Sequence, residues 1–353
     1  MQILVNEMMT HQNVLLVGPP GIAKTAIIHD VAKKCGYATE IDTVEGRMST
    51  VIRASLMERV DLTGCLVPDQ KNGVTRQLPF VLIKALQETK DKVMFFIDDL
   101  GQSPMDAQAA IMRLFDNNFF PESLVVWAAT NRPGDKAGVS ALCEPLRSRF
   151  HSAYCVPVPG DRVKADGGVL LCEWTEYAEN WVDWALDNGA PPEIIAWHRS
   201  TNGNNLYTWT PCADPSVRMA DFRSWGAMIK RWNSGLRSMS SVSGVIGKAA
   251  AAEFLAFASL SEGLPSPDQV WMDPSGAPVP SEISAQYLIS SILAQQVQVS
   301  CIEAFVTYIA RLKKVMTGFA GRDAYRRLGA SVSGSKGWTK WFLANREMFN
   351  LDK

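Results

Sequence analysis

The sequence has few features that would tie it to secretion, to a metal-stabilised fold or to a membrane. Its seven cysteines are scattered with no CxxC pair, which argues against a disulfide framework and against a zinc ribbon. The first residues contain no basic segment followed by an apolar run, so we expect no secretory signal. The longest uncharged run, residues 283–302, is rich in Ser and Gln and fits an amphipathic helix better than a membrane span. We therefore expect a cytoplasmic protein with no membrane contact.

A surplus of positive charge is also missing. The chain has 35 Lys and Arg against 36 Asp and Glu, a net charge of −1. Because a nucleic-acid-binding domain usually carries a basic surplus, we do not expect nucleic acid as a partner. Apolar residues make up 47% of the chain, which is typical of globular proteins, and 353 residues are long for one hydrophobic core. The composition therefore predicts two or three globular domains.

The first part of the chain alternates short apolar runs with helical patterns. The apolar runs cover residues 14–17, 93–97 and 124–129, and each is followed by polar residues. Such runs, alternating with helices, predict an α/β fold with a parallel sheet that is buried on both faces. Functional loops of these sheets leave the carboxyl ends of the strands, so we expect the chemistry there.

After residue 157 the sequence becomes helical and rich in tryptophan. Seven of the eleven tryptophans lie between Trp174 and Trp232, and their near-helical spacing predicts core packing. A stretch rich in Pro and Gly predicts a linker, and two long helical segments follow it. The linker covers residues 263–280, and the helical segments cover 282–318 and 321–350. We expect three domains: an αβα core at 1–157, a helical lid at 158–262, and the linker with a helical C-terminal extension at 263–353.

The segment GPPGIAKT follows a predicted strand and opens a predicted helix, the context that the phosphate-loop pattern GxxxxGK[ST] requires. Such a loop surrounds a phosphate with backbone N–H groups, aided by the positive end of the helix. Lys24 would reach the β- and γ-phosphates of ATP, and Thr25 would ligate Mg²⁺. Ala23 stands where the second glycine is usual, and because alanine restricts positive φ we expect an ordinary backbone conformation there. The nucleotide-binding residues of the loop are Gly18, Pro19, Pro20, Gly21, Ile22, Ala23, Lys24 and Thr25.

Two further strands deliver polar residues that would complete a hydrolytic site. In FFIDDLG, residues 95–101, Asp98 would hold Mg²⁺ and Asp99 would orient and deprotonate the attacking water. Aspartate is about 1.5 Å shorter than the glutamate more common in this role, so we expect slow hydrolysis. In AATNRP, residues 128–133, Asn131 would fix the water from the other side.

The segment EPLRSRF, residues 144–150, then supplies Arg147 and Arg149. An arginine that reaches the γ-phosphate of a neighbouring subunit stabilises the charge of the transition state.

With these residues in place, the chain resembles AAA+ ATPases of the MoxR type. It is most similar to a bacterial and phage subgroup that often neighbours a von Willebrand A-type protein. The resemblance rests on GPPGIAKT, on RVDLTGCLVPD at 59–69, on SPMDAQAAIMRLFD at 103–116 and on NRPGDKAGVSALCEPLRSRFH at 131–151. It continues into the helical segments at 180–199, 219–232 and 245–260.

The resemblance implies a P-loop NTPase core followed by an α-helical lid. It places Arg149 on the family's arginine finger, with Arg147 as second choice, and Arg223 on the sensor 2 arginine, with Arg218 as competitor. It further implies a homo-oligomer, expected as a hexameric ring with a helical filament as alternative. The implied activity is chaperone-like remodelling of a partner protein, and a von Willebrand A-type protein is a candidate partner. Residues 116–124 are too short for a long presensor hairpin, which argues against threading of a peptide through a central pore.

Two other functions remain open from the sequence. The IDDLG segment at 97–101 is also the form found in helicase loaders and transposition ATPases, so a DNA-transaction ATPase is the alternative. A nucleotide-switched scaffold with little turnover follows if Asp99 cannot activate water.

Overall fold

The computed structural model divides into two compact units, Met1–Tyr177 and Ala178–Lys353. This division is coarser than the three domains expected from the sequence, whose limits stay predictions. The structure describes residues 1–135, 142–160, 168–212, 214 and 216–349.

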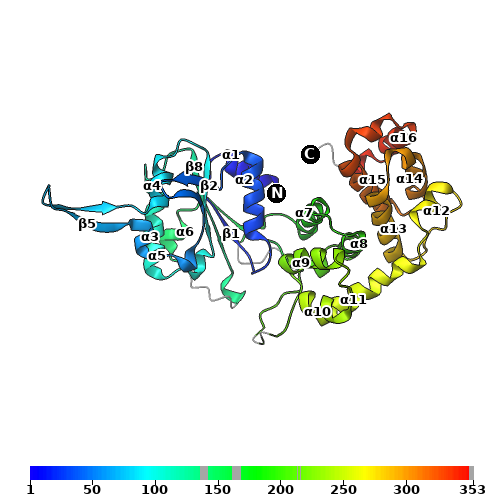
Figure 1. The fold of residues 1–353 in the computed structure, drawn as a ribbon, viewed down its shortest axis with the longest axis horizontal. Helices are drawn as coiled ribbons and strands as arrows, with labels where there is room; N and C mark the ends of the chain where they lie inside the picture. The colour runs from blue at the N-terminus through cyan, green and yellow to red at the C-terminus, as the bar shows by residue number, and fades with distance from the viewer. Residues whose placement is uncertain (136–141, 161–167, 213, 215, 350–353) are drawn as a thin grey trace. The chain divides into compact units, whose positions relative to one another are not determined.

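The first unit is built on a five-stranded, all-parallel sheet (Figure 1). In spatial order the strands are β4 (Val51–Arg53), β7 (Val93–Asp98), β8 (Leu124–Thr130), β1 (Val14–Val17) and β9 (Ser152–Cys155). The three central strands are the apolar runs of the sequence, and β8 is buried along its whole length. The predicted α/β fold with a parallel sheet is therefore confirmed. The edge strands β4 and β9 are short and less apolar, so they did not stand out in the sequence.

Helices pack against this sheet and complete its hydrophobic core. Helix α4 shows why: its apolar residues Leu82, Ile83 and Leu86 lie on one face and are buried against β7 and its neighbours. The helices of the first unit are α1 (Gln2–Met9), α2 (Lys24–Cys35), α3 (Arg59–Thr63), α4 (Val81–Glu88), α5 (Met105–Met112) and α6 (Glu144–Arg147). Between α5 and β8, residues 116–123 form turns without a strand, in keeping with the absence of a presensor hairpin there.

Two small antiparallel hairpins lie outside the main sheet. One pairs β2 (Glu40–Thr43) with β3 (Gly46–Ser49), and the other pairs β5 (Cys65–Asp69) with β6 (Val74–Leu78). The β5–β6 hairpin extends away from the rest of its unit, and nearly all of its strand residues are exposed (Figure 1). Gly64 forms its base at φ +79, where a Cβ would lie 2.0 Å from the carbonyl oxygen of Leu78. Only glycine fits this approach.

The second unit is helical. Its aromatic residues pack as the spacing predicts: Trp181 and Trp225 are buried, and the ring of His198 lies between them, 5.1 Å and 4.3 Å from their centroids. Helix α7 (Trp174–Asp187) begins in the first unit and continues into the second. The helices that follow are α8 (Pro192–Ser200), α9 (Phe222–Asn233), α10 (Met239–Ile246), α11 (Lys248–Ser259), α12 (Pro267–Met272), α13 (Ile283–Gln296), α14 (Ile302–Ile309), α15 (Lys314–Leu328) and α16 (Lys336–Ala344). In the described ranges, no helix combines the length and apolar character that a membrane span needs.

The expected linker and long helices of the C-terminal part are corrected by the structure. Residues 263–280 contain helix α12, which begins with a capping box between Ser266 and Gln269 and buries Val270 completely. The segment expected as one helix at 282–318 is divided into α13, α14 and the start of α15. Neither division is marked by Pro or Gly, so packing into the common core decided where these helices end.

A buried arginine ties three helices of the second unit together. Arg199 of α8 is 4% exposed, and its guanidinium donates to Glu179 of α7 at 2.7 Å and to Asp323 of α15 at 2.5 Å and 2.9 Å. Burial disfavours its charge, but the two carboxylates outweigh burial and hold the pKa of Arg199 above its usual value. Removing Asp323 would leave the buried guanidinium with Glu179, which also pairs with Arg322, so part of the buried positive charge would lose its compensation.

We therefore predict that Asp323→Asn lowers the free energy of unfolding of the second unit by about 3–5 kcal/mol. The measurement is urea unfolding followed by tryptophan fluorescence. The matched control is Asp187→Asn, because Asp187 is 59% exposed and pairs with Arg326 at the surface. It should cost less than about 1 kcal/mol. Equal losses in the two variants would contradict the role given to the buried cluster.

Candidate active site

The loop between β1 and α2 lies at the carboxyl edge of the sheet. Its first residue, Gly18, donates its N–H to the carbonyl of Thr130 at the end of β8, at 3.1 Å. A Cβ on Gly18 would lie 3.0 Å from the Cβ of Val156, tighter than almost all real contacts of this kind. The absence of a side chain at Gly18 therefore lets the loop lie directly against the strand ends.

The backbone at Ala23 differs from the sequence prediction. An ordinary conformation was expected, but Ala23 adopts the left-handed conformation at φ +69 and caps the start of α2. The prediction is wrong because the loop imposes its shape on whichever residue stands there. For an L-residue such as alanine this conformation costs roughly 1–2 kcal/mol, which the contacts of the loop must offset.

Lys24, the first residue of α2, is 7% exposed and points back into the loop. Its ammonium donates to the carbonyls of Gly18 at 2.8 Å and Pro19 at 3.0 Å, and to the Asn131 amide oxygen at 2.7 Å. Burial lowers the pKa of Lys24 from 10.5 to about 8, and the nearby carboxylates of Asp98 and Asp99 oppose this shift. The ammonium is thus held between the loop and the end of β8.

Thr25 and Asp98 form a second contact between the loop and the sheet. The Thr25 hydroxyl donates to Asp98 Oδ2 at 2.7 Å, and Asp98 Oδ1 accepts from the backbone N–H of Asp99 at 3.1 Å. One carboxylate and one hydroxyl supply hard oxygen ligands of the kind that Mg²⁺ prefers, and water and phosphate oxygens would complete its shell. The residues present therefore fit a magnesium ion.

Asn131 contacts both the Lys24 ammonium and the Asp99 carboxylate. It follows β8 directly and is 4% exposed. Its amide oxygen accepts from Lys24, and its amide nitrogen approaches Asp99 Oδ1 at 3.5 Å. Asp99 itself adopts φ +55, a left-handed conformation that Asp and Asn tolerate better than most residues. The positive φ gives a backbone reason for aspartate at this position.

Sequence reasoning missed a pair of charged residues beside Asn131. Asp135 is 5% exposed, and its carboxylate accepts from the backbone N–H of Arg132 at 2.9 Å and from its guanidinium at 3.1–3.2 Å. The available signal was an arginine directly after Asn131 and an aspartate three residues beyond that arginine. The segment 131–151, on which part of the family resemblance rests, includes residues 136–141, which lie outside the described residues.

The predicted arginines of the first unit, Arg147 and Arg149, lie outside this cluster. Arg149 precedes β9, and β9 runs parallel to β1 with Ser152 opposite Val14 and Cys155 opposite Val17. Arg149 therefore lies at the amino edge of the sheet, whereas the loop lies at the carboxyl edge. Arg147 is exposed and pairs with Glu144 at 3.0 Å. Arg223 and its competitor Arg218 are exposed residues of the second unit.

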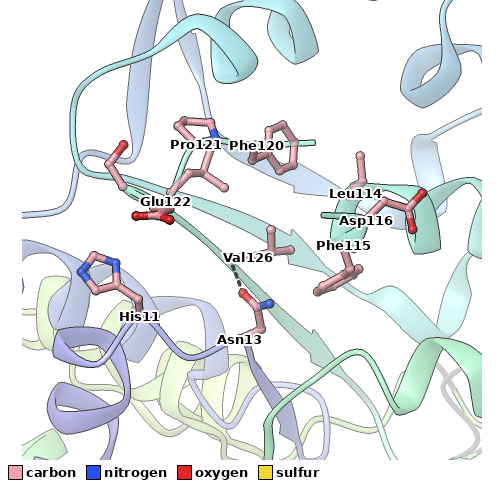
Figure 2. A pocket seen from close by; sticks show the side chains of 11 residues that line it. His11, Asn13, Leu114, Phe115, Asp116, Phe120, Pro121, Glu122 and Val126 are labelled. Atoms are coloured by element: carbon pink, nitrogen blue, oxygen red, sulfur yellow. Dashed lines mark hydrogen bonds between the residues drawn. The ribbon is translucent and has the colours of Figure 1, made fainter. Parts of the chain in front are cut away.

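A cavity of about 610 Å³ lies at the amino edge of the sheet and is distinct from the loop (Figure 2). It is lined by residues that precede β1, such as Asn13, and by residues between α5 and β8, such as Phe120 and Glu122. The Asn13 side chain accepts from the backbone N–H of Val126, which fixes one wall. Because phosphate loops act at the carboxyl edge, this cavity is not the nucleotide site.

The family model of the ATPase family associated with various cellular activities (AAA) matches residues 14–158. This range contains the loop, both acids, Asn131 and Arg149. A curated relative, Midasin of Giardia intestinalis, is 26% identical over 155 residues, which are 40% of this chain and 3% of that protein. The chain thus spans a very small part of the length of this relative. The match to the family model covers less than half of the chain, and over residues 14–158 the structure has the P-loop fold of these ATPases.

Several solved structures are similar over larger parts of the chain, at low identity. The Thermotoga maritima RuvB Holliday junction branch migration motor is 17% identical, with a TM-score of 0.35 over 76% of this chain and 71% of that chain. NtrX from Brucella abortus, in complex with ADP, is 12% identical, with a TM-score of 0.40 over 99% and 67%. A Cytophaga hutchinsonii protein described as a putative ATPase is 14% identical, with a TM-score of 0.30 over 98% and 87%.

We predict that Lys24→Ala weakens Mg·ATP binding about 10- to 100-fold, because one charge-assisted contact of about 1.5–3 kcal/mol is lost. Isothermal titration calorimetry measures this, with circular dichroism to check the fold. The control is Lys33→Ala, which removes an exposed lysine from the same helix and should leave the affinity unchanged. Unchanged affinity in Lys24→Ala would contradict the site.

Proposed function

We propose that the AAA ATPase domain binds Mg·ATP and hydrolyses it, and that the chain acts as a homo-oligomer whose subunits share each site. One observation carries the proposal. Hydrogen bonds bring together five residues that follow three different strands. They are Lys24, Thr25, Asp98, Asp99 and Asn131. A cation, a hard-oxygen pair, a carboxylate and an amide at one loop are the groups that phosphoryl transfer to water needs.

Lys24 provides the charge at the phosphates. In the structure its ammonium donates to two carbonyl oxygens and one amide oxygen, and charged phosphate oxygens are stronger acceptors than these. Thr25 and Asp98 would hold Mg²⁺, which neutralises negative charge on the phosphates.

Asp99 and Asn131 would activate and orient the attacking water. A general base must lie within hydrogen-bond reach of its water, and Asp99 stands beside the Asn131 amide at the same edge as Lys24. Asn131 orients the water through its amide, and Asp99 accepts the proton. Because aspartate reaches less far than glutamate, we expect slow turnover.

Arg149 completes the site of a neighbouring subunit. Strand β1 has four residues between the two edges of the sheet and alone spans about 13 Å, so Arg149 cannot approach the loop of its own chain. Its side chain is 44% exposed, and within the described part of the chain its ion-pair partner is Asp116, at 4.0 Å. An arginine of this kind contributes on the order of 10³–10⁵ in rate when it meets the transferred phosphoryl group.

Shared sites imply head-to-tail assembly. A head-to-tail contact closes into a ring when the rotation fits and continues as a helix when it does not. We propose a hexameric ring, with a helical filament as the alternative form.

The resemblance to MoxR-type proteins supports a remodelling role, with Arg223 as the sensor 2 arginine of the lid. The β5–β6 hairpin is consistent with contact to a partner protein, because a two-stranded hairpin is marginal in water alone and this one exposes Leu66 by 71% and Val74 by 51%. A von Willebrand A-type protein is the partner that the resemblance suggests.

We predict that the wild-type protein turns over ATP at less than about 1 s⁻¹, and that Asp99→Asn abolishes hydrolysis while keeping ATP binding. Asparagine tolerates the left-handed backbone at this position, so the variant removes the base without straining the turn. Phosphate release measures the rate, and fluorescent-nucleotide titration measures binding. Full turnover in Asp99→Asn would show that another group activates the water.

We predict that Arg149→Ala keeps ATP binding but loses hydrolysis by on the order of 10³-fold or more. The matched control is Arg147→Ala, which removes an exposed arginine two positions away and should stay active. Mixing Arg149→Ala with Lys24→Ala is the decisive measurement. Random mixing gives about a quarter of interfaces with an intact loop and an intact arginine, so part of the activity should return.

Analytical ultracentrifugation with ATP checks that the two variants assemble together. A mixture that assembles and stays inactive contradicts the shared site. Normal hydrolysis by Arg149→Ala as a monomer contradicts it as well.

A further inference from the structure

The turn after β8 is closed by one backbone hydrogen bond and by the side chain of Asp135. The Asp135 N–H donates to the carbonyl of Arg132 at 3.0 Å, and the Arg132 N–H donates to the Asp135 carboxylate at 2.9 Å. The Arg132 guanidinium adds contacts to both carboxylate oxygens at 3.1–3.2 Å. Asp135 thus fixes the backbone and the side chain of the residue that immediately follows Asn131.

This turn has buried ends, Asn131 and Asp135, while Pro133 and Gly134 between them are exposed. Asp135 is 5% exposed and Asn131 is 4% exposed. Burial is the largest influence on the pKa of Lys24, and among the smaller influences Asp135 raises it and Arg132 lowers it. Both charges therefore lie within electrostatic range of Lys24.

A buried ion pair is weak evidence of a gain in stability, because desolvation of the charges offsets their attraction. A neutral turn residue would close residues 132–135 at lower cost. The Asp135 carboxylate accepts from the planar Arg132 guanidinium through both of its oxygens. This fixes the orientation of the two side chains as well as the distance between them, which a neutral side chain would do less well. Orientation matters here because Asn131 makes two directed contacts, to Lys24 and towards Asp99.

We propose that Asp135 is a positioning residue of the ATPase site, which holds the turn after β8 so that the Asn131 amide stays between Lys24 and Asp99. The proposal rests on the proposed function. Asp135 does not itself touch nucleotide or water. Its effect passes through Asn131, whose displacement by about 1 Å is enough to cost on the order of 10²-fold in rate.

The test is a double-mutant cycle of Asp135→Asn and Asn131→Ala. Asp135→Asn should lower kcat for ATP hydrolysis about 10- to 100-fold and leave KM for ATP nearly unchanged. In the Asn131→Ala background, the same change should have little further effect. Equal losses in both backgrounds would overturn the proposal. An increase in KM without a decrease in kcat would overturn it too.

Two further variants test whether the effect is specific to Asp135 and whether it comes from the Arg132 guanidinium. Asp91→Asn removes an exposed carboxylate just before β7, at the other edge of the sheet, and should leave kcat unchanged. Arg132→Met keeps the backbone contact to Asp135 but loses the guanidinium, so it should lose less activity than Asp135→Asn. A larger loss in Arg132→Met would show that the arginine acts on the nucleotide directly, and would overturn the role given to Asp135.

A crystal structure of Asp135→Asn gives a readout that does not need turnover. The Asn131 amide should turn away from the Lys24 ammonium, which it contacts at 2.7 Å in the wild-type protein. An unchanged Asn131 would overturn the proposal even if the wild-type protein hydrolyses no ATP. Absent hydrolysis in the wild-type protein would instead contradict the proposed function, so the two failures are distinguishable.

Discussion

The candidate site depends on the hydrogen bonds of the buried Lys24 ammonium. Its three hydrogen bonds join the phosphate loop to the end of β8. A buried charge that lacks such partners costs several kcal/mol, so the loop carbonyls and Asn131 are constrained to face it. On either side of this contact, Ala23 adopts a left-handed backbone directly before Lys24, and the Asp135 carboxylate closes the turn that follows Asn131.

The strands of the parallel sheet hold the phosphate loop and Arg149 apart, at opposite edges of the sheet. Parallel strands deliver their carboxyl ends to one edge, where the loop, Asp98 and Asn131 meet. The same register places Arg149 at the other edge, beside Asp116. In the proposed site, nucleotide binds at the loop of one chain, and the arginine finger proposed at Arg149 would come from a second copy. The proposal of an oligomer follows from the strand register.

Much of the fold and of the site could be predicted because the signals are local. The apolar runs at 14–17, 93–97 and 124–129 became β1, β7 and β8, and the residues that follow them became the site. The β5–β6 hairpin could not be predicted in this way, because its residues alternate weakly and no core covers them. Helix α12 was concealed by the Pro and Gly around it, although its capping box was readable from Ser266 and Gln269.

The sequence by itself determined which groups are available: a lysine and a threonine after a glycine-rich loop, two aspartates after one strand and an asparagine after another. These identities are chemical, so order along the chain was enough to recognise them. Only the tertiary structure decided that Ala23 is left-handed, that Asp135 is buried beside Asn131, and that Arg149 lies at the opposite edge. The physical reason is that φ, burial and strand register come from packing between segments far apart in the chain. No short stretch of sequence contains that packing.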